Sequence, residues 1–275
     1  MPEFAEVETI RKTLKKQVLK KQIKEVDIYW NKIIEYPLLE DFSNMIKGQT
    51  IIDIKRRGKW LLFELNNFYL LSHLRMEGKY FLKKEKDEVK KHEHVIIRFT
   101  DNTELRYHDT RKFGKMYLLK KDEIDIKGPL IKLGLEPFDN NLTVSYLKNK
   151  LKKKIISIKL SLLDQSIIAG IGNIYADEIL FKSKINPSKK SNKLTKNELQ
   201  SIIDNTKEIL SEAVNAGGTT IRSYTSSEGI TGRFQNNLYV HTKEGELCKI
   251  CNNFIKKIKV GGRGTYYCPF CQKNK

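Results

Sequence analysis

The sequence has no apolar run long enough to cross a bilayer, and it has very little cysteine. No stretch of about 18 apolar residues occurs, and Met1 opens an acidic start rather than the basic-then-apolar pattern of a signal peptide. Its 275 residues include only 4 cysteines, all from Cys248 onward. These absences disfavour a membrane protein and a disulfide framework spread along the chain. We therefore expect a cytoplasmic protein.

Acidic residues are also scarce relative to basic ones. The chain has 52 Lys+Arg against 33 Asp+Glu, a formal charge of +19 and a pI near 9.6. Such positive potential suits a polyanion, and nucleic acid is the expected partner. An anionic membrane surface is the alternative, which the lack of an apolar segment disfavours. The length and the 39% hydrophobic content predict two or three folded units.

The residue pattern changes twice along the chain. The residues after Met1 read as one amphipathic helix that Pro2 starts, with Glu3 and Glu6 in its first turn and apolar residues at spacings of three and four up to Val18. Short β-like runs separated by turn residues follow in residues 21–120. Helical patterns begin after Gly134, and paired cysteines mark the end of the chain. The sequence thus predicts an α+β multidomain protein, with an N-terminal helix and β-sandwich in 1–132, a helical domain in 133–234 and a cysteine hairpin in 235–275.

The last long helix carries explicit boundary signals. Thr195 is the expected N-cap, Glu198 closes a capping box, and Gly217-Gly218 ends the helix. The polar, glycine-bearing segment that follows, residues 219–235, has the length of a loop that is either disordered or functional.

The spacing C-x2-C-x16-C-x2-C is the most specific signal in the chain. Two closely spaced thiolate pairs close a tetrahedral site, so we expect one structural Zn2+. The four ligands are Cys248, Cys251, Cys268 and Cys271. Strand-like runs between the pairs flank Gly261-Gly262-Arg263-Gly264, which places Arg263 at a hairpin tip. An ordinary exposed arginine is the alternative, but the basic setting favours a phosphate contact.

Other motifs are weak when taken singly. In "AGIGNIYADEI", Asn173 is positioned to cap a helix whose N-terminus suits a phosphate, although a plain helix-helix turn is the alternative. Likewise Lys59, His73 and His92, one by one, fit packed or surface residues of a sandwich.

Seven ordered segments together give a stronger signal. They are "MPEFAEVET", "RRGKW", "SHLRMEG", "HDTRKFG", "GIGNIYADE", "GGTTIRSY" and "GGRGTYYCPFCQ". In order and spacing they resemble bacterial formamidopyrimidine-DNA glycosylase, an 8-oxoguanine DNA glycosylase/AP lyase. The resemblance covers essentially the whole chain. It implies a β-sandwich, a helix-two-turn-helix domain and a zinc-finger β-hairpin, acting as a monomer on damaged double-stranded DNA.

The resemblance implies a catalytic role for Pro2 once Met1 is removed. An α-amine has a pKa of about 7.7 to 8, so part of it is unprotonated at neutral pH. Its attack on C1' of a damaged nucleotide expels the base and leaves an iminium, which permits β- and δ-elimination. Glu3 is the implied general acid/base, and Glu6 supports it. The family usually starts Pro-Glu-Leu-Pro-Glu, so Phe4 and Ala5 are departures that affect local packing.

The remaining site residues also come from the resemblance. Lys59 and Arg263 are assigned catalytic roles beside Pro2 and Glu3. Met76, Arg111 and Phe113 are the implied wedge that fills the hole left by an everted base. The implied phosphate or damage contacts are Lys59, His73, His92, Asn173 and Arg263. The loop 217–235 corresponds to the family's lid over the everted purine.

Two alternatives stay open at this stage. An endonuclease VIII-like glycosylase shares the fold and the Pro-Glu start but excises oxidised pyrimidines; Arg111-Lys112-Phe113 and the long lid favour the purine branch. A non-enzymatic DNA- or ribosome-binding protein would use only the helical domain and the zinc hairpin.

Overall fold

The computed structural model describes residues 1–85, 87–219 and 232–273. Its contacts divide the chain into two compact units. The first contains residues 1–131 and 217–232, and the second contains residues 132–216 and 233–275. The finer boundaries expected from the sequence, at 132/133 and 234/235, stay predictions.

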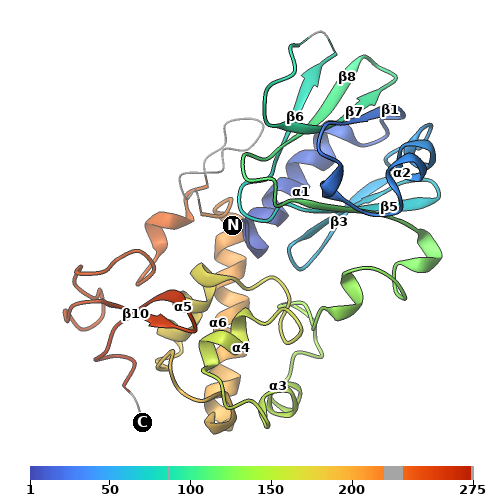
Figure 1. Cartoon of the computed structure of the whole chain (residues 1–275). Helices are drawn as coiled ribbons and strands as arrows, with labels where there is room; N and C mark the ends of the chain where they lie inside the picture. The colour runs from blue at the N-terminus through green and yellow to red at the C-terminus, as the bar shows by residue number, and fades with distance from the viewer. Residues whose placement is uncertain (86, 220–231, 274–275) are drawn as a thin grey trace. The chain divides into compact units, whose positions relative to one another are not determined.

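The first unit begins with helix α1 (Phe4–Val18), drawn in dark blue in Figure 1. Its apolar face is buried, as the spacing of Val7, Ile10, Leu14 and Val18 predicts. Glu3 is the N-cap, so Pro2 precedes the helix rather than forming its first turn. The helix packs on strands β3 (Asp53–Arg57) and β4 (Trp60–Glu64).

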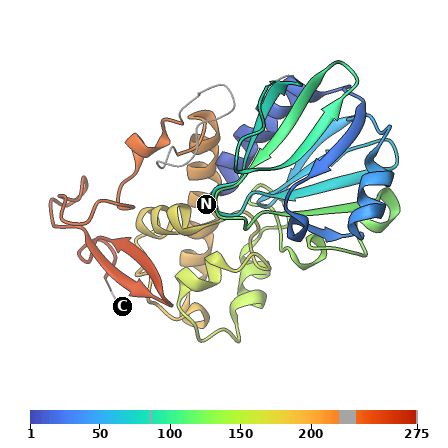
Figure 2. The same cartoon turned by 45° about the horizontal axis from the view of Figure 1, so that its top comes forward.

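Two sheets form the expected sandwich, and Figure 2 shows their strands in two layers. An antiparallel sheet has the order β1-β7-β8-β6: Ile23–Ile28, Glu93–Phe99, Thr103–His108 and Lys79–Lys84. A five-stranded sheet has the order β2-β9-β5-β4-β3, in which β2 (Ile34–Tyr36), β9 (Lys115–Lys120) and β5 (Phe68–His73) precede β4 and β3. Strand β2 runs parallel to β9, and the other pairs are antiparallel.

One apolar core lies between these layers and includes side chains of both sheets and of α1. Helix α2 (Leu39–Ile46) adds Phe42 and Ile46 to it. The sequence patterns predicted neither α2 nor β6, because both are short and carry several charges among their apolar residues. The predicted N-terminal helix and β-sandwich are confirmed.

The second unit is built around helix α6 (Lys196–Asn215), with α3 (Val144–Leu151), α4 (Ile158–Leu163) and α5 (Asn173–Lys182) (Figure 1). The predicted capping box of α6 is confirmed, since the Thr195 side chain accepts from the Glu198 N–H and Glu198 returns a bond to the Thr195 N–H. The apolar stretch 161–183 is not one helix. Residues 164–172 separate α4 from α5, and Gly172 rather than Asn173 is the N-cap of α5.

A hairpin of β10 (Lys256–Val260) and β11 (Arg263–Tyr267) completes the second unit. Gly261 and Gly262 form its turn with φ of +54° and +76°, a left-handed conformation that favours glycine. Arg263 is therefore the first residue of β11, opposite Val260. Short 3-10 turns connect other elements: Asn31–Ile33, Lys121–Glu123, Leu130–Lys132, Ser191–Lys193 and Phe234–Asn237. Within the described ranges, no helix is long and apolar enough to span a membrane.

Candidate active site

The N-terminal dipeptide is buried at the start of α1. Pro2 and Glu3 are both buried, with Glu3 only 3% exposed, whereas Met1 is 42% exposed. Glu3 is the N-cap of α1 and forms a capping box with Glu6, at the end of the helix whose dipole favours a carboxylate. Both residues expected to act in catalysis thus lie at the start of α1, and their roles stay predictions.

Glu6 fixes the backbone of that dipeptide. Its Oε2 accepts from the Glu3 N–H at 2.9 Å, while its Oε1 accepts from the Thr219 N–H at 2.8 Å and from the Thr219 hydroxyl at 2.9 Å. A β-carbon on Gly218 would lie 2.9 Å from Glu6 Oε1, so only glycine allows this approach. One carboxylate thus joins the start of α1 to the first residues of the segment 217–235. The lid expected there lies mostly outside the described residues, since 220–231 are not among them.

Lys59 lies in the tight turn between β3 and β4 and is 5% exposed. The turn is supported from α1, because the Arg56 guanidinium lies 3.8 Å above the Phe4 ring and donates to the Gly58 carbonyl at 3.0 Å. Arg56 also pairs with Glu8 at 3.2 Å. Phe4, one of the departures from the family's usual start, therefore contributes to positioning the Lys59 turn.

His73, at the end of β5, is 8% exposed and neutral at physiological pH. Burial, together with the nearby Arg75 and Lys59 charges, lowers its pKa from 6.5 to about 3. Its Nδ1 accepts from the Arg75 N–H at 3.0 Å, and Trp60 packs edge-on against its ring. The side chain thus shapes the chain that leads to Met76, and its expected phosphate contact stays a prediction.

The three expected wedge residues lie on two loops after β5 and β8. Met76 is 38% exposed, Phe113 is 49% exposed, and Arg111 is also exposed, with its guanidinium 4.7 Å from the Phe113 ring centroid. Exposed apolar side chains beside an arginine, held in well-ordered loops, are suited to insertion between bases.

Asp109 organises the second of these loops, and the sequence analysis did not identify it. Its carboxylate accepts from the N–H groups of Arg111, Phe113 and Gly114 at 2.9 to 3.0 Å. An aspartate directly before an exposed polar turn is the signal that identifies such a residue.

His92 contacts the first residue of the same loop, Asp109. Its carbonyl accepts from the Asp109 N–H at 3.0 Å, and its ring is near those of His94 and His108. His94 Nε2 is 2.9 Å from the Asp109 carbonyl oxygen. Burial lowers the pKa of both His94 and His108. His92 is half-buried, so its role as a DNA contact stays a prediction.

In the second unit, Asn173 binds the backbone carbonyl of Gly264, the residue that follows Arg263. Asn173 Nδ2 donates to the Gly264 carbonyl at 3.0 Å, and Lys159 Nζ donates to it at 3.1 Å. Lys159 is fully buried and pairs at 2.6 Å with Asp177, which also lies 2.8 Å from His241 Nδ1. Lys159 on α4 and Asn173 on α5 therefore fix the strand that begins with the exposed Arg263.

Sequence reasoning missed Lys159, Asp177 and His241. A lysine within the apolar run "SIKLSLL" is the one local signal for Lys159, because such a residue becomes buried and needs a partner.

The four cysteine sulfurs form a compact cluster. They lie within 4.8 Å of one another, with Cys248 and Cys271 Sγ 4.0 Å apart and Cys251 and Cys268 Sγ 3.5 Å apart. Four thiolates about 2.3 Å from a tetrahedral Zn2+ are about 3.8 Å apart, so the cluster fits the ion. The predicted structural zinc site is confirmed.

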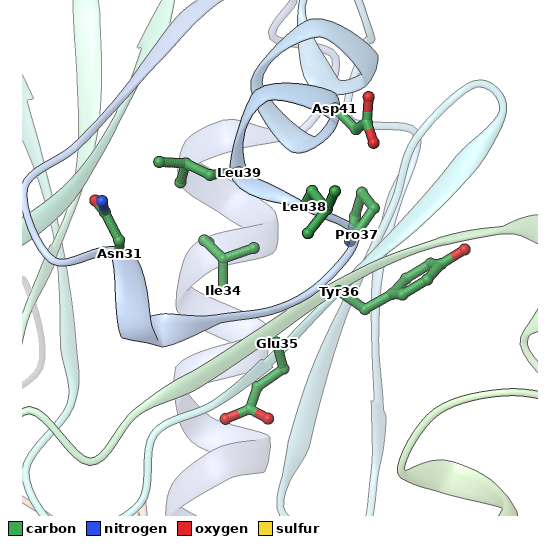
Figure 3. Close-up of a pocket in the computed structure, with 8 residues that line it drawn as sticks. All are labelled: Asn31, Ile34, Glu35, Tyr36, Pro37, Leu38, Leu39 and Asp41. Atoms are coloured by element: carbon green, nitrogen blue, oxygen red, sulfur yellow. The ribbon is translucent and has the colours of Figure 1, made fainter.

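A separate depression of about 500 Å³ lies between β2 and α2 (Figure 3). Ile34, Leu38 and Leu39 contribute apolar surface to it, while Glu35 points away from them. None of the predicted site residues lines this depression.

Family comparisons cover almost the whole chain. Residues 1–116 match the formamidopyrimidine-DNA glycosylase N-terminal domain, residues 133–225 match the H2TH domain of the same enzymes, and residues 245–274 match the zinc finger found in FPG and IleRS. The chain belongs to the formamidopyrimidine-DNA glycosylase family. The formamidopyrimidine-DNA glycosylase of Oceanobacillus iheyensis is 49% identical over 100% of this chain and 99% of its own. That of Bacillus licheniformis is 50% identical over 99% of this chain and 100% of its own.

Solved structures of this family agree with the fold. A Lactococcus lactis FPG variant in complex with Fapy-dG containing DNA has a TM-score of 0.93 and 39% identity, covering 99% of this chain and 100% of that one. A complex of the Lactococcus lactis enzyme with abasic site containing DNA has a TM-score of 0.92 at the same identity and coverage. The resemblance noted from seven short segments is thus confirmed along the chain.

Acid should destabilise the first unit in part through His73. The unfolded chain binds a proton at this histidine below pH 6.5, whereas folded His73 does so only near pH 3. The contribution of His73 to the free energy of unfolding is therefore fully present above pH 6.5. It decreases as the pH falls towards 3, by up to about 1.4 kcal/mol per pH unit. We expect His73→Gln to flatten the pH dependence of urea unfolding between pH 7 and 5. An unchanged slope relative to the natural sequence would contradict the neutral, buried state of His73.

Loss of zinc should abolish the expected binding of DNA by the hairpin. Cys248→Ser removes one of four ligands, and a small hairpin with few apolar side chains depends on its metal. We expect loss of duplex binding while near-ultraviolet circular dichroism of the first unit persists. Ile250→Ser, which changes an exposed residue inside the same knuckle, is the matched control and should keep zinc and binding. Full affinity in metal-free protein would refute this role.

Proposed function

We propose that this chain is a bifunctional DNA glycosylase/AP lyase that removes oxidised purines, 8-oxoguanine and formamidopyrimidines, through a covalent intermediate at Pro2. The observation that carries the proposal is the buried Pro2-Glu3 pair in a chain that matches one glycosylase family from end to end. Damaged double-stranded DNA in a bacterial cytoplasm is the proposed target, with the enzyme acting as a monomer.

Removal of Met1 gives Pro2 a free secondary amine for the first step. Its lone pair forms a bond to C1' while the bond from C1' to the base breaks, and the departing base takes up a proton. The amine nitrogen then loses its one N–H proton to a base, and opening of the sugar ring with protonation of the ring oxygen forms a cationic iminium that has no N–H left to lose. Glu3 is the nearest carboxyl along the chain and is assigned the proton transfer to the ring oxygen.

Strand cleavage follows from the same intermediate. The iminium withdraws electrons and acidifies C2', so loss of a C2' proton expels the 3' phosphate in β-elimination. Loss of a second proton expels the 5' phosphate in δ-elimination. Lys59 and Arg263 are proposed to serve these phosphate-releasing steps, since both are cations on tight hairpins.

Duplex recognition divides between the two units. Met76, Arg111 and Phe113 are proposed to fill the space of the everted nucleotide, with the guanidinium bonded to the unpaired base. His73, His92, Asn173 and Arg263 are proposed as phosphate or damage contacts. The supporting observations are the exposure of the wedge side chains and the bond from Asn173 to the Gly264 carbonyl next to Arg263.

Two observations favour oxidised purines as the substrates: the DNA bound in related structures and the residues of the proposed wedge. The Lactococcus lactis complexes hold Fapy-dG and abasic site DNA, and Arg111-Lys112-Phe113 favours reading of an opposite cytosine. Single-turnover excision should be faster for 8-oxoguanine opposite cytosine than for thymine glycol in an otherwise identical duplex. Faster removal of thymine glycol would replace this proposal with the endonuclease VIII-like one, and binding without any cleavage would favour a non-enzymatic protein.

Glu3→Gln should keep DNA binding but lose base excision, because the substitution keeps the size of the side chain and removes its transferable proton. Single-turnover excision of 8-oxoguanine and the duplex Kd are measured together. Glu40→Gln, which changes an exposed carboxylate in the first turn of α2, is the control and should excise normally. Excision by Glu3→Gln at the natural rate would remove Glu3 from the mechanism.

Arg111→Ala should flatten the preference for the opposite base. The arginine donors match the O2 and N3 acceptors of cytosine, whereas adenine offers fewer acceptors on that edge. We expect 8-oxoguanine excision opposite cytosine to exceed that opposite adenine, and the variant to lose about 1 to 3 kcal/mol of this difference. Lys16→Ala, which removes an exposed cation from the last turn of α1, is the control and should leave the preference unchanged. An equal preference in Arg111→Ala and the natural protein would show that another group reads the base.

A further inference from the structure

The two wedge loops meet at a single hydroxyl group. Tyr107, on β8, is 1% exposed. A β-carbon built on Gly114 would overlap its Oη and lie 2.7 Å from its Cζ, and one built on Gly78 would overlap the same Oη and lie 2.9 Å from Cζ. Neither glycine has a positive φ, so the need for glycine at both positions is steric. The last residue of each loop therefore packs directly on Tyr107.

Polar contacts join the same loops near their tips. The Thr110 hydroxyl, beside Arg111, donates to the Glu77 carboxylate, beside Met76. Tyr107 Oη also donates to Asp109 Oδ2 at 3.4 Å, and this carboxylate holds the backbone of Arg111, Phe113 and Gly114. The 74–78 loop and the 109–114 loop are thus connected at the base through Tyr107 and at the tip through Thr110.

Both loops also contain a residue in the left-handed region, Arg75 with φ of +53° and Lys112 with φ of +56°. Such a backbone costs energy for a non-glycine residue and persists only where its surroundings hold it. His73 Nδ1 accepts from the Arg75 N–H, and Lys112 Nζ lies 4.2 Å from the Trp30 ring centroid. Contacts within the protein therefore support the backbone of both loops.

We propose that Tyr107 is a positioning residue that sets opposite-base specificity by holding the Met76 loop and the Arg111–Phe113 loop as one preformed wedge. It contacts neither the lesion nor the unpaired base and acts through Gly78, Gly114 and Asp109. A base-edge contact is directional, so a shift of a few tenths of an ångström at Gly114 weakens the reading by Arg111 more than it weakens chemistry at Pro2. This inference rests on the proposed function.

Three single variants and one double variant test it. Tyr107→Phe removes only the shared hydroxyl, and Gly114→Ala forces the second loop away from it. Tyr80→Phe is the matched control, because Tyr80 is equally buried, packs edge-on against Tyr107 and directs its hydroxyl to Ser72, away from both loops. Excision of 8-oxoguanine is measured opposite cytosine and opposite adenine, and lyase activity is measured on a single-stranded abasic oligonucleotide, which has no opposite base.

The natural protein and Tyr80→Phe should show the same cytosine preference. Tyr107→Phe and Gly114→Ala should each reduce this preference by about threefold or more, with single-stranded lyase rates unchanged. The double variant Tyr107→Phe/Gly114→Ala should recover part of the Gly114→Ala loss, because the added methyl then faces Cζ at 2.7 Å instead of overlapping Oη.

A cytosine preference that Tyr107→Phe and Gly114→Ala both retain would overturn the inference and leave the glycosylase proposal intact. Equal losses of preference and of single-stranded lyase activity would also overturn it, because they would indicate general damage to the unit. Absence of 8-oxoguanine excision in the natural protein would instead refute the proposed function itself. A fluorescent 2-aminopurine opposite the lesion gives a readout independent of catalysis, and its unstacking should decrease in both single variants.

Discussion

The bonds around the Glu6 carboxylate are the constraint on which the rest of the first unit depends. The proposed nucleophile Pro2, once Met1 is removed, must be held in place although it has only one neighbour in the chain. Glu6 accomplishes this through the Glu3 N–H and binds Thr219 with its other oxygen. Helix α1 is in turn fixed by apolar burial on the sheet. The position of the Pro2 nitrogen thus depends on one buried, fully engaged carboxylate.

The same principle recurs at two exposed residues of the proposed site. Arg263 projects from a strand whose Gly264 carbonyl receives two buried donors, and Arg111 projects from a loop whose backbone is held by Asp109. In each case, a buried polar group fixes the backbone beside the exposed residue. Polar bonds are directional, whereas apolar packing tolerates small shifts, so they are suited to aiming a side chain at DNA.

Much of this could be predicted from the sequence, for identifiable physical reasons. The α1 face, the α6 capping box and the zinc ligands depend on local spacing, and all three were predicted correctly. Asp109, Lys159 and Tyr107 depend on partners distant in the chain, such as Gly264 or Gly78, that no local pattern identifies. The boundary of α5 was misplaced by one residue because Gly172 and Asn173 are both acceptable N-caps. His73, expected to touch phosphate, is buried and neutral because tertiary packing decides its pKa.

The central claim is that the amine of Pro2 forms the covalent intermediate. Its most direct test combines the intact mass of the purified protein with borohydride reduction on 8-oxoguanine duplex, followed by peptide mass spectrometry of the adduct. The account predicts a protein lacking Met1 and a reduced sugar attached to the N-terminal peptide at Pro2. An adduct on a lysine such as Lys59, or active protein that retains Met1, would contradict it.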